Sequence, residues 1–245
     1  MTRYEICGIF IDDVTMDEAV QRIDRMLWLT RPHAVYYANP ETLVRAARNE
    51  AFRATMRTAD LVFPDGIGLK IFGMIIGAPF RERIAGVDLL FLVCERAARL
   101  GKSVFLIGSR NNVAARASLV LEKRFPTLHV SGTLNGYEGA EKWEHNTAIK
   151  NADIVFVGLG SPKQEEWMRD NMHELPHAKC MVAVGGAFDM IAGDTPRAPI
   201  WMRTGGMEWV WRVCMDPRRW RRIMNAVIVF PVKAVVWHIK KDKTQ

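Results

Sequence analysis

Residues 154–165 read IVFVGLGSPKQE: four apolar residues, a glycine-containing turn, and then a segment with strong helix-start signals. A short apolar run ended by glycine is typical of a strand that is buried on both faces of a sheet. The same order of apolar run, polar turn and helical stretch recurs at 35–48 and 104–125. This alternation of strands and helices predicts an α/β fold, with a mostly parallel sheet and helices on both faces.

Working outward from this stretch, the predicted strands are 6–11, 35–38, 61–63, 104–107, 154–157 and 181–184. The predicted helices are 15–29, 40–48, 51–57, 87–100, 112–125 and 162–172, and the first opens on the capping box Thr15-Met16-Asp17-Glu18. The composition changes near residue 199. We therefore expect one α/β domain, residues 1–198, followed by a C-terminal appendage, residues 199–245.

The appendage carries the charge asymmetry of the chain. Residues 203–245 hold ten Lys/Arg and three acidic residues, which equals the whole formal net charge of +7, and 199–245 holds five of the eight tryptophans. Such a segment favours an anionic surface, either a membrane or a nucleic acid. The apolar run 226–237 favours a membrane, but as a helix of about 18 Å it is too short for a bilayer core of about 30 Å. We expect it to lie on the surface of a membrane, without nucleic acid as a partner.

Cysteine usage and the N-terminus suggest a compartment. The four cysteines, Cys7, Cys94, Cys180 and Cys214, have no metal-ligand spacing, and their apolar neighbours predict buried free thiols in a reducing environment. The first residues lack the basic region and apolar core of a signal peptide. The sequence therefore predicts a cytoplasmic protein.

The loops after the predicted strands are the candidate site, because ligands of parallel α/β sheets bind beyond the carboxyl ends of the strands. Gly158, Gly160 and Ser161 follow one strand and Gly108 follows another. Such loops let a phosphate approach backbone amides at a helix start. A competing interpretation is helix capping, with Ser161 as N-cap and Gln164 completing a capping box. Neither loop is a GxGxxG or Walker sequence, so dinucleotide and ATPase sites are poorly supported.

Asp65 stands between Pro64 and Gly66 at the end of the run 61–63. A carboxylate on a strand end, beside a glycine that leaves room for substrate, suits a general base. The local sequence alone favours a competing interpretation, in which Asp65 caps a helix that begins near Gly66. The charged cluster 81–83 is equally open: an arginine there could neutralise a departing diphosphate, or it could be a solvated loop charge.

Taken together, these segments resemble the TagA/WecG/CpsF glycosyltransferase family, glycosyltransferase family 26. The resemblance covers nearly the whole chain. It rests on ANPETLVRAARN (38–49), TADLVFPDGIGL (58–69), ERIAGVDLL (82–90), VFLIGS (104–109), NADIVFVGLGSPKQEEWM (151–168), VAVGGAFDMIAGDTPRAP (182–199) and GMEWVWRVCMDPRRWRR (206–222). It implies a Rossmann-like domain and an inverting glycosyltransferase that uses a UDP-sugar and needs no metal or other cofactor. The sequence has no Asp-x-Asp, the arrangement that holds a metal in many nucleotide-sugar enzymes.

The resemblance also implies residue roles. Asp65 would be the base that deprotonates the acceptor hydroxyl, and Arg83 would stabilise the leaving UDP. The donor would be bound by Asn39, Gly108, Gly158, Gly160, Ser161 and Gln164. Arg212, Arg219 and Arg222, which share one face of a helix, would hold the diphosphate of the acceptor. One position departs from the family pattern: Tyr37 stands where a threonine is expected, which affects the choice of donor sugar.

The sequence-based hypothesis is therefore transfer of a sugar from a UDP-sugar to a polyprenyl-diphosphate-linked acceptor in bacterial cell-surface polysaccharide synthesis, including exopolysaccharide. UDP-glucose, UDP-N-acetylmannosamine and its uronic acid all remain candidate donors. The enzyme would be bound peripherally to the inner face of the cytoplasmic membrane through its appendage, and a homo-oligomer remains open. The alternatives are a nucleotide-binding regulatory or nucleic-acid-binding module with a basic tail, and a nucleotide-sugar hydrolase.

Overall fold

The computed structural model describes residues 2–136, 143–216, 220, 224 and 228–242. Its centre is a six-stranded sheet in the order β4-β3-β8-β7-β5-β6, in which every neighbouring pair is parallel. The strands are β3 (His33–Ala38), β4 (Leu61–Pro64), β5 (Ser103–Gly108), β6 (His129–Asn135), β7 (Ile154–Gly158) and β8 (Cys180–Ala183). The predicted parallel α/β architecture is confirmed.

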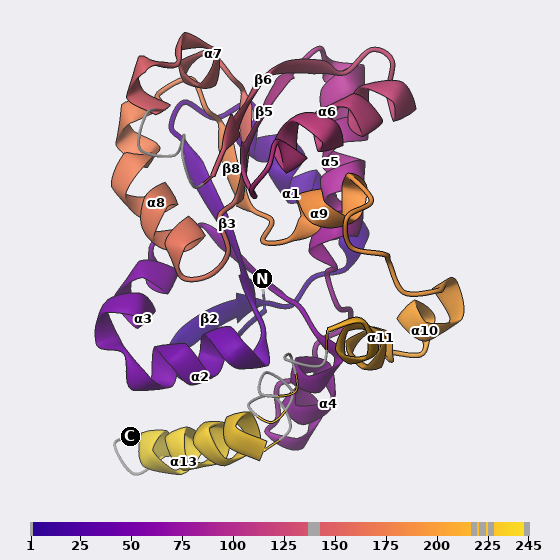
Figure 1. The fold of residues 1–245 in the computed structure, drawn as a ribbon. Helices are drawn as coiled ribbons and strands as arrows, with labels where there is room; N and C mark the ends of the chain where they lie inside the picture. The colour runs from indigo at the N-terminus through magenta and orange to yellow at the C-terminus, as the bar shows by residue number, and fades with distance from the viewer. Residues whose placement is uncertain (1, 137–142, 217–219, 221–223, 225–227, 243–245) are drawn as a thin grey trace.

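Helices cover both faces of the sheet, because successive side chains of each strand point to opposite sides. Tyr36 and Val155 belong to one core, and Tyr37 and Phe156 belong to the other. The first core is closed by α2 (Pro40–Arg48), α3 (Glu50–Arg57), α7 (Thr147–Lys150) and α8 (Lys163–Asn171). The second is closed by α1 (Met16–Met26), α5 (Gly86–Leu100), α6 (Val113–Arg124) and α9 (Ala187–Ile191). Figure 1 shows α8 and α6 on opposite sides of the sheet.

The predicted strand 6–11 is wrong. The chain instead forms β1 (Arg3–Ile6) and β2 (Ile9–Asp12), an antiparallel hairpin that makes a separate two-stranded sheet. Cys7 and Gly8 form the turn with φ of 52° and 78°. A two-residue turn with both φ values positive matches the twist of the strands that it joins. The sequence did not reveal this turn, because Cys7 is apolar and continues the apolar run that is typical of a strand. The structure shows that Cys7 is buried even though it lies in the turn.

Strand β6 is absent from the sequence-based prediction. It lies at the edge of the sheet, and its residues HVSGTLN are partly exposed rather than buried. An edge strand is paired on one side only, so it needs no continuous apolar run. The signal used for the other strands therefore missed it.

The C-terminal region is helical and packs on the domain. Its described helices are α10 (Ile200–Thr204), α11 (Glu208–Met215) and α13 (Phe230–Asp242). In Figure 1, α13 runs beside α2, and Phe230 meets Phe72 of α4 (Ile67–Ile75) edge-on, with ring centroids 5.2 Å apart. Within the described part of the chain, no helix has both the length and the apolar character to cross a bilayer.

Three of the four cysteines are buried as predicted, namely Cys7, Cys94 and Cys180. Cys214 is exposed on α11, so the prediction of burial is wrong for this residue. The reason is geometric: neighbours in sequence on a helix point in different directions, so apolar neighbours do not imply a shared buried face.

Candidate functional site

The candidate site is a cleft at the carboxyl ends of the parallel strands, where segments that follow five strands meet. Its first compartment has a volume of about 430 Å³ and is lined by residues that follow β3, β4, β7 and β8. A second compartment of about 390 Å³ lies between the loops after β5, β7 and β8. Gly160, Gly185, Gly186 and Asp189 line both compartments, so the two form one continuous depression.

Asp65 lines the first compartment. The capping interpretation is wrong, because α4 begins at Ile67 with Gly66 as N-cap and receives no side-chain cap. The Asp65 carboxylate instead accepts a hydrogen bond from the adjacent Gly66 amide at 2.8 Å and lies 3.8 Å from Arg83 Nη1. Gly66 has a φ of 89°, a conformation that favours glycine. The strand end therefore holds the carboxylate at the cleft, with its side chain 35% exposed.

The charged cluster 81–83 divides into two parts. Arg81 binds Asp13 and Glu18 of the neighbouring α1 region, and Glu82 accepts from the Met16 amide at 2.8 Å, so both are structural. Arg83 is the member that reaches the edge of the cleft, and it also pairs with Glu208 of α11 at 3.2 Å. Arg83 thus links Asp65 to the C-terminal helices, although it does not line either compartment.

Asn39 lines the first compartment and begins α2. Its side-chain oxygen accepts from the Glu41 and Thr42 amides, both at 3.0 Å, which leaves the Nδ2 group as its remaining hydrogen-bonding group. Tyr37, two residues earlier, also lines the compartment, and its hydroxyl is buried without a hydrogen-bond partner among the described residues. Burial first, and then the charge of Asp65, raise the pKa of Tyr37 well above its ordinary value. The phenol is therefore protonated.

The loop after β7 does not cap α8 in the predicted way. The helix begins at Lys163 with Pro162 as N-cap and receives no side-chain cap, so the capping box of Ser161 and Gln164 is not formed. The Gln164 side chain instead accepts from the Gly185 amide at 3.0 Å and donates to Glu165 at 2.8 Å. Burial raises the pKa of Glu165. Gln164 thereby ties the loops after β7 and β8 together while lining the first compartment with Ser161.

The three predicted glycines have different roles. A Cβ at Gly108 would lie 2.4 Å from the backbone of Gly158, so Gly108 permits close approach of β5 and β7 and lines neither compartment. Gly158 lines the second compartment, and its own Cβ position is blocked by the ring of Phe188 at 2.8 Å. Gly160 has open space around it and lines both compartments.

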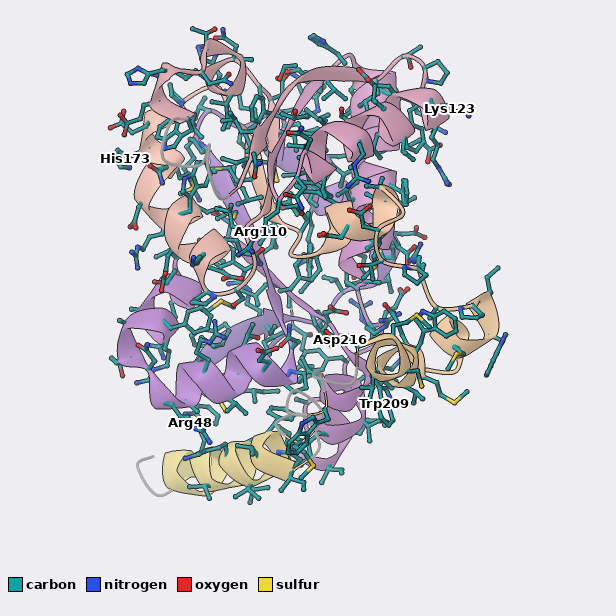
Figure 2. All side chains as sticks on the ribbon, in the orientation of Figure 1. Arg48, Arg110, Lys123, His173, Trp209 and Asp216 are labelled. Atoms are coloured by element: carbon teal, nitrogen blue, oxygen red, sulfur yellow. The ribbon has the colours of Figure 1, made fainter. Side chains whose placement is uncertain are left out.

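Several lining residues were not selected from the sequence. Asp189 lines both compartments and accepts a hydrogen bond from the Ser109 hydroxyl at 3.0 Å. Arg110 lines the second compartment and is labelled near the centre of Figure 2. Both follow the same strand–glycine–helix pattern as the selected loops, so this pattern was the signal that could have identified them.

Comparison with known proteins identifies the family of the chain. The model of the glycosyl transferase WecG/TagA/CpsF family matches residues 4–244. The chain belongs to this family. It is therefore a glycosyltransferase, and the resemblance found in its motifs is confirmed.

Two similar proteins come from Bacillus and Staphylococcus species. A protein of Bacillus spizizenii (strain ATCC 23059 / NRRL B-14472 / W23) is 34% identical over 77% of this chain and 73% of its own length. One from Staphylococcus aureus (strain MRSA252) is 28% identical over 98% of this chain and 96% of its own length. Both are named N-acetylglucosaminyldiphosphoundecaprenol N-acetyl-beta-D-mannosaminyltransferase.

Two further predictions for this WecG/TagA/CpsF member concern the arginines that would bind the acceptor diphosphate and the expected absence of a metal. Arg212 lies in α11, whereas Arg219 and Arg222 fall outside the described residues. Among the residues that the structure describes, no group of three or more His, Cys, Asp or Glu side chains is arranged to hold a metal ion. The binding of the acceptor diphosphate by Arg212, Arg219 and Arg222 stays a prediction, and so does catalysis without a metal.

Proposed function

We propose that the chain transfers a sugar from a UDP-sugar to a sugar carried on a polyprenyl diphosphate, with inversion at the anomeric carbon and without a metal. Family membership and the names of the two relatives support the reaction class and the type of acceptor. The product would enter bacterial cell-surface polysaccharide synthesis. The donor is one of UDP-glucose, UDP-N-acetylmannosamine and its uronic acid.

The position of Asp65 carries this proposal. Its carboxylate lines the first compartment at the end of β4, together with Asn39, Ser161 and Gln164. In the proposed step, Asp65 takes the proton of the acceptor hydroxyl while that oxygen bonds to the anomeric carbon. The bond from this carbon to the diphosphate oxygen breaks, and UDP leaves with the electron pair from the opposite side of the sugar. A carboxylate in reach of the attacking hydroxyl is what general-base catalysis requires.

The other predicted residues surround this reaction. Asn39, Gly158, Gly160, Ser161 and Gln164 would bind the donor. Arg83 would neutralise the charge that develops on the leaving UDP, because an arginine can stabilise charge that appears in the transition state. Gly108 would act indirectly, by bringing the loops after β5 and β7 close to each other.

The acceptor and the membrane would meet the enzyme at the C-terminal helices. Trp201, Trp209 and Trp220 are 63%, 46% and 53% exposed, and Trp209 is labelled on α11 in Figure 2. Indoles prefer the interface between lipid and water, and the basic excess of residues 203–245 favours anionic lipid. Residues 199–245 would therefore place the enzyme at the inner face of the cytoplasmic membrane, where Arg212, Arg219 and Arg222 hold the acceptor diphosphate.

The decisive experiment is Asp65→Asn in the purified full chain, assayed with a panel of UDP-sugars and a short-chain lipid-linked acceptor. We expect turnover to fall by about 10²- to 10⁴-fold, the usual contribution of a general base, while the affinity for UDP is retained. Asp17→Asn, an exposed acid on α1, is the matched control. Normal turnover in Asp65→Asn would reject the assignment. UDP release without acceptor would indicate a hydrolase instead.

The membrane contact is tested by replacing Trp201, Trp209 and Trp220 with serine. We expect binding to vesicles of phosphatidylglycerol and phosphatidylcholine to weaken by about tenfold or more, because each indole loses its apolar burial. Trp28→Ser removes a tryptophan that is 69% exposed on the body of the protein and should leave vesicle binding unchanged. Equal loss in both variants, or binding to nucleic acid in place of vesicles, would contradict the docking role.

A further inference from the structure

The lining of the cleft is acidic, although the proposed donor carries a negatively charged diphosphate. Glu41 and Asp65 line the first compartment, Asp194 lines the second, and Asp189 lines both. Among the described residues that line either compartment, Arg110 is the only Lys or Arg. A diphosphate that enters an acid-lined depression needs a positive charge to offset the repulsion. Arg110 is the lining residue with that charge.

The place of Arg110 in the fold suits this role. It lies two residues after the end of β5 and lines the second compartment with Gly158, Leu159 and Gly160, which end β7 and follow it. These glycines expose backbone to any group in the compartment, which favours phosphate over a bulky apolar group. Ser109, just before Arg110, donates a hydrogen bond to Asp189 of α9 at 3.0 Å, so the loop that carries the arginine is anchored to α9.

Three other arginines lie near the cleft, and none of them lines a compartment. Arg45 lies 3.9 Å from Glu41, Arg83 lies 3.2 Å from Glu208, and Arg116 makes two short bonds to Asp194. In Figure 2, the label of Arg110 lies between α8 and α9.

We propose that Arg110 binds the diphosphate of the donor, and so seats the nucleotide half in the second compartment with the sugar in the first, facing Asp65. The inference rests on the proposed use of a UDP-sugar. It adds a division of the cleft: phosphate recognition comes from the loop after β5, and proton transfer comes from the end of β4. The arginine fork matches the paired oxygens of a phosphate, which a lysine binds only as a point charge.

The test is calorimetric binding of UDP, UMP and uridine to the full chain and to Arg110→Gln. We expect the affinity for UDP to fall by about 10- to 100-fold, the usual worth of a charged hydrogen bond, with the affinity for uridine unchanged. Arg110→Lys should recover part of the loss. The control is Lys123→Gln, which removes a positive charge from the other end of α6, as Figure 2 shows, and should leave UDP binding intact.

The outcomes separate this inference from the proposed function. If the wild-type chain binds no UDP, the proposed function fails and this inference fails with it. If the wild type binds UDP and Arg110→Gln binds it equally well, only the role of Arg110 is overturned. A matching loss for uridine would also overturn it, because Arg110 would then contact the nucleoside rather than the phosphates.

Discussion

The two ends of the parallel strands hold acidic side chains in opposite settings. At the amino ends, Asp60 precedes β4 and accepts from the Ala34 amide of β3 at 2.9 Å. Asp153 precedes β7 and accepts from the Ser103 amide of β5, also at 2.9 Å. Each carboxylate thus fastens its own strand to the start of a neighbouring strand. The same arrangement occurs twice in one sheet.

At the carboxyl ends, Asp65 and Asp189 line a cleft instead of joining strands. Asp65 accepts from its own neighbour Gly66 and lies near Arg83, which leaves it at the surface of the compartment. The comparison teaches that the residue type does not decide the role. A carboxylate surrounded by strand amides contributes to stability, and one that faces an open cleft can do chemistry.

The largest effect is expected from a buried acid of the hairpin. Asp12 is fully buried, accepts from the Val62 amide of β4 at 2.9 Å, and pairs with Arg3 and Arg22. Asp12→Ala leaves that buried amide unpaired, so we expect the free energy of unfolding in urea to fall by about 3 kcal/mol. Transfer activity per folded molecule should be unchanged, in contrast to Asp65→Asn.

The matched control for Asp12→Ala is Glu122→Ala, an exposed acid on α6. It should change the free energy of unfolding by no more than about 0.5 kcal/mol, as is usual for surface substitutions. A loss of catalysis in folded Asp12→Ala, with stability intact, would erase the proposed distinction between structural and catalytic acids.

A smaller effect is expected at Tyr37, whose ring lies between Phe63 and the start of α5. Tyr37→Thr vacates space in the first compartment, so the kcat/KM for UDP-N-acetylmannosamine relative to UDP-glucose should rise by about tenfold. Tyr37→Phe keeps the ring and removes a buried, unpartnered hydroxyl. It should leave the donor preference unchanged and stabilise the fold by about 1 kcal/mol.

Steady-state kinetics with both donors and urea unfolding of each variant check these two expectations. An unchanged ratio of kcat/KM values in Tyr37→Thr would contradict this role of Tyr37, because the ring would then not limit the donor sugar. A changed ratio in Tyr37→Phe would also contradict it, because the hydroxyl rather than the volume of the side chain would then select the donor.

Much of the sheet could be predicted because its buried strands are continuous apolar runs. β7, with the sequence IVFVG, is buried at every residue, and the glycine that ends it is visible in the sequence. The edge strand β6 and the turn at Cys7 and Gly8 could not be found this way. An exposed edge needs no apolar run, and a turn residue that is buried imitates a strand residue.

The candidate site was predictable only where local sequence and tertiary contacts agree. The end of a strand indicates that Asp65 lies at a functional edge, but its capping role could be rejected only once the start of α4 was known. Gln164 looks like a capping residue in the sequence, whereas its side chain accepts a hydrogen bond from Gly185 in the loop after β8. The charge imbalance that points to Arg110 depends on which loops meet, and no single loop contains that information.

The smallest effect is expected from the pH dependence of the amino-end acids. Burial alone would raise the pKa of Asp153, but hydrogen bonds from Ser103 and Lys102 outweigh it and lower the pKa below the ordinary 3.8. A carboxyl group whose pKa is lower in the folded state stabilises the fold at pH values above its pKa in the unfolded state. This contribution disappears as the pH falls through its pKa in the folded state. The stability advantage of wild type over Asp153→Asn should therefore be about 1 kcal/mol at pH 7 and shrink below about pH 4. Urea unfolding across this range measures it, and an advantage that does not change with pH would mean that the charge of Asp153 does not hold the strands together.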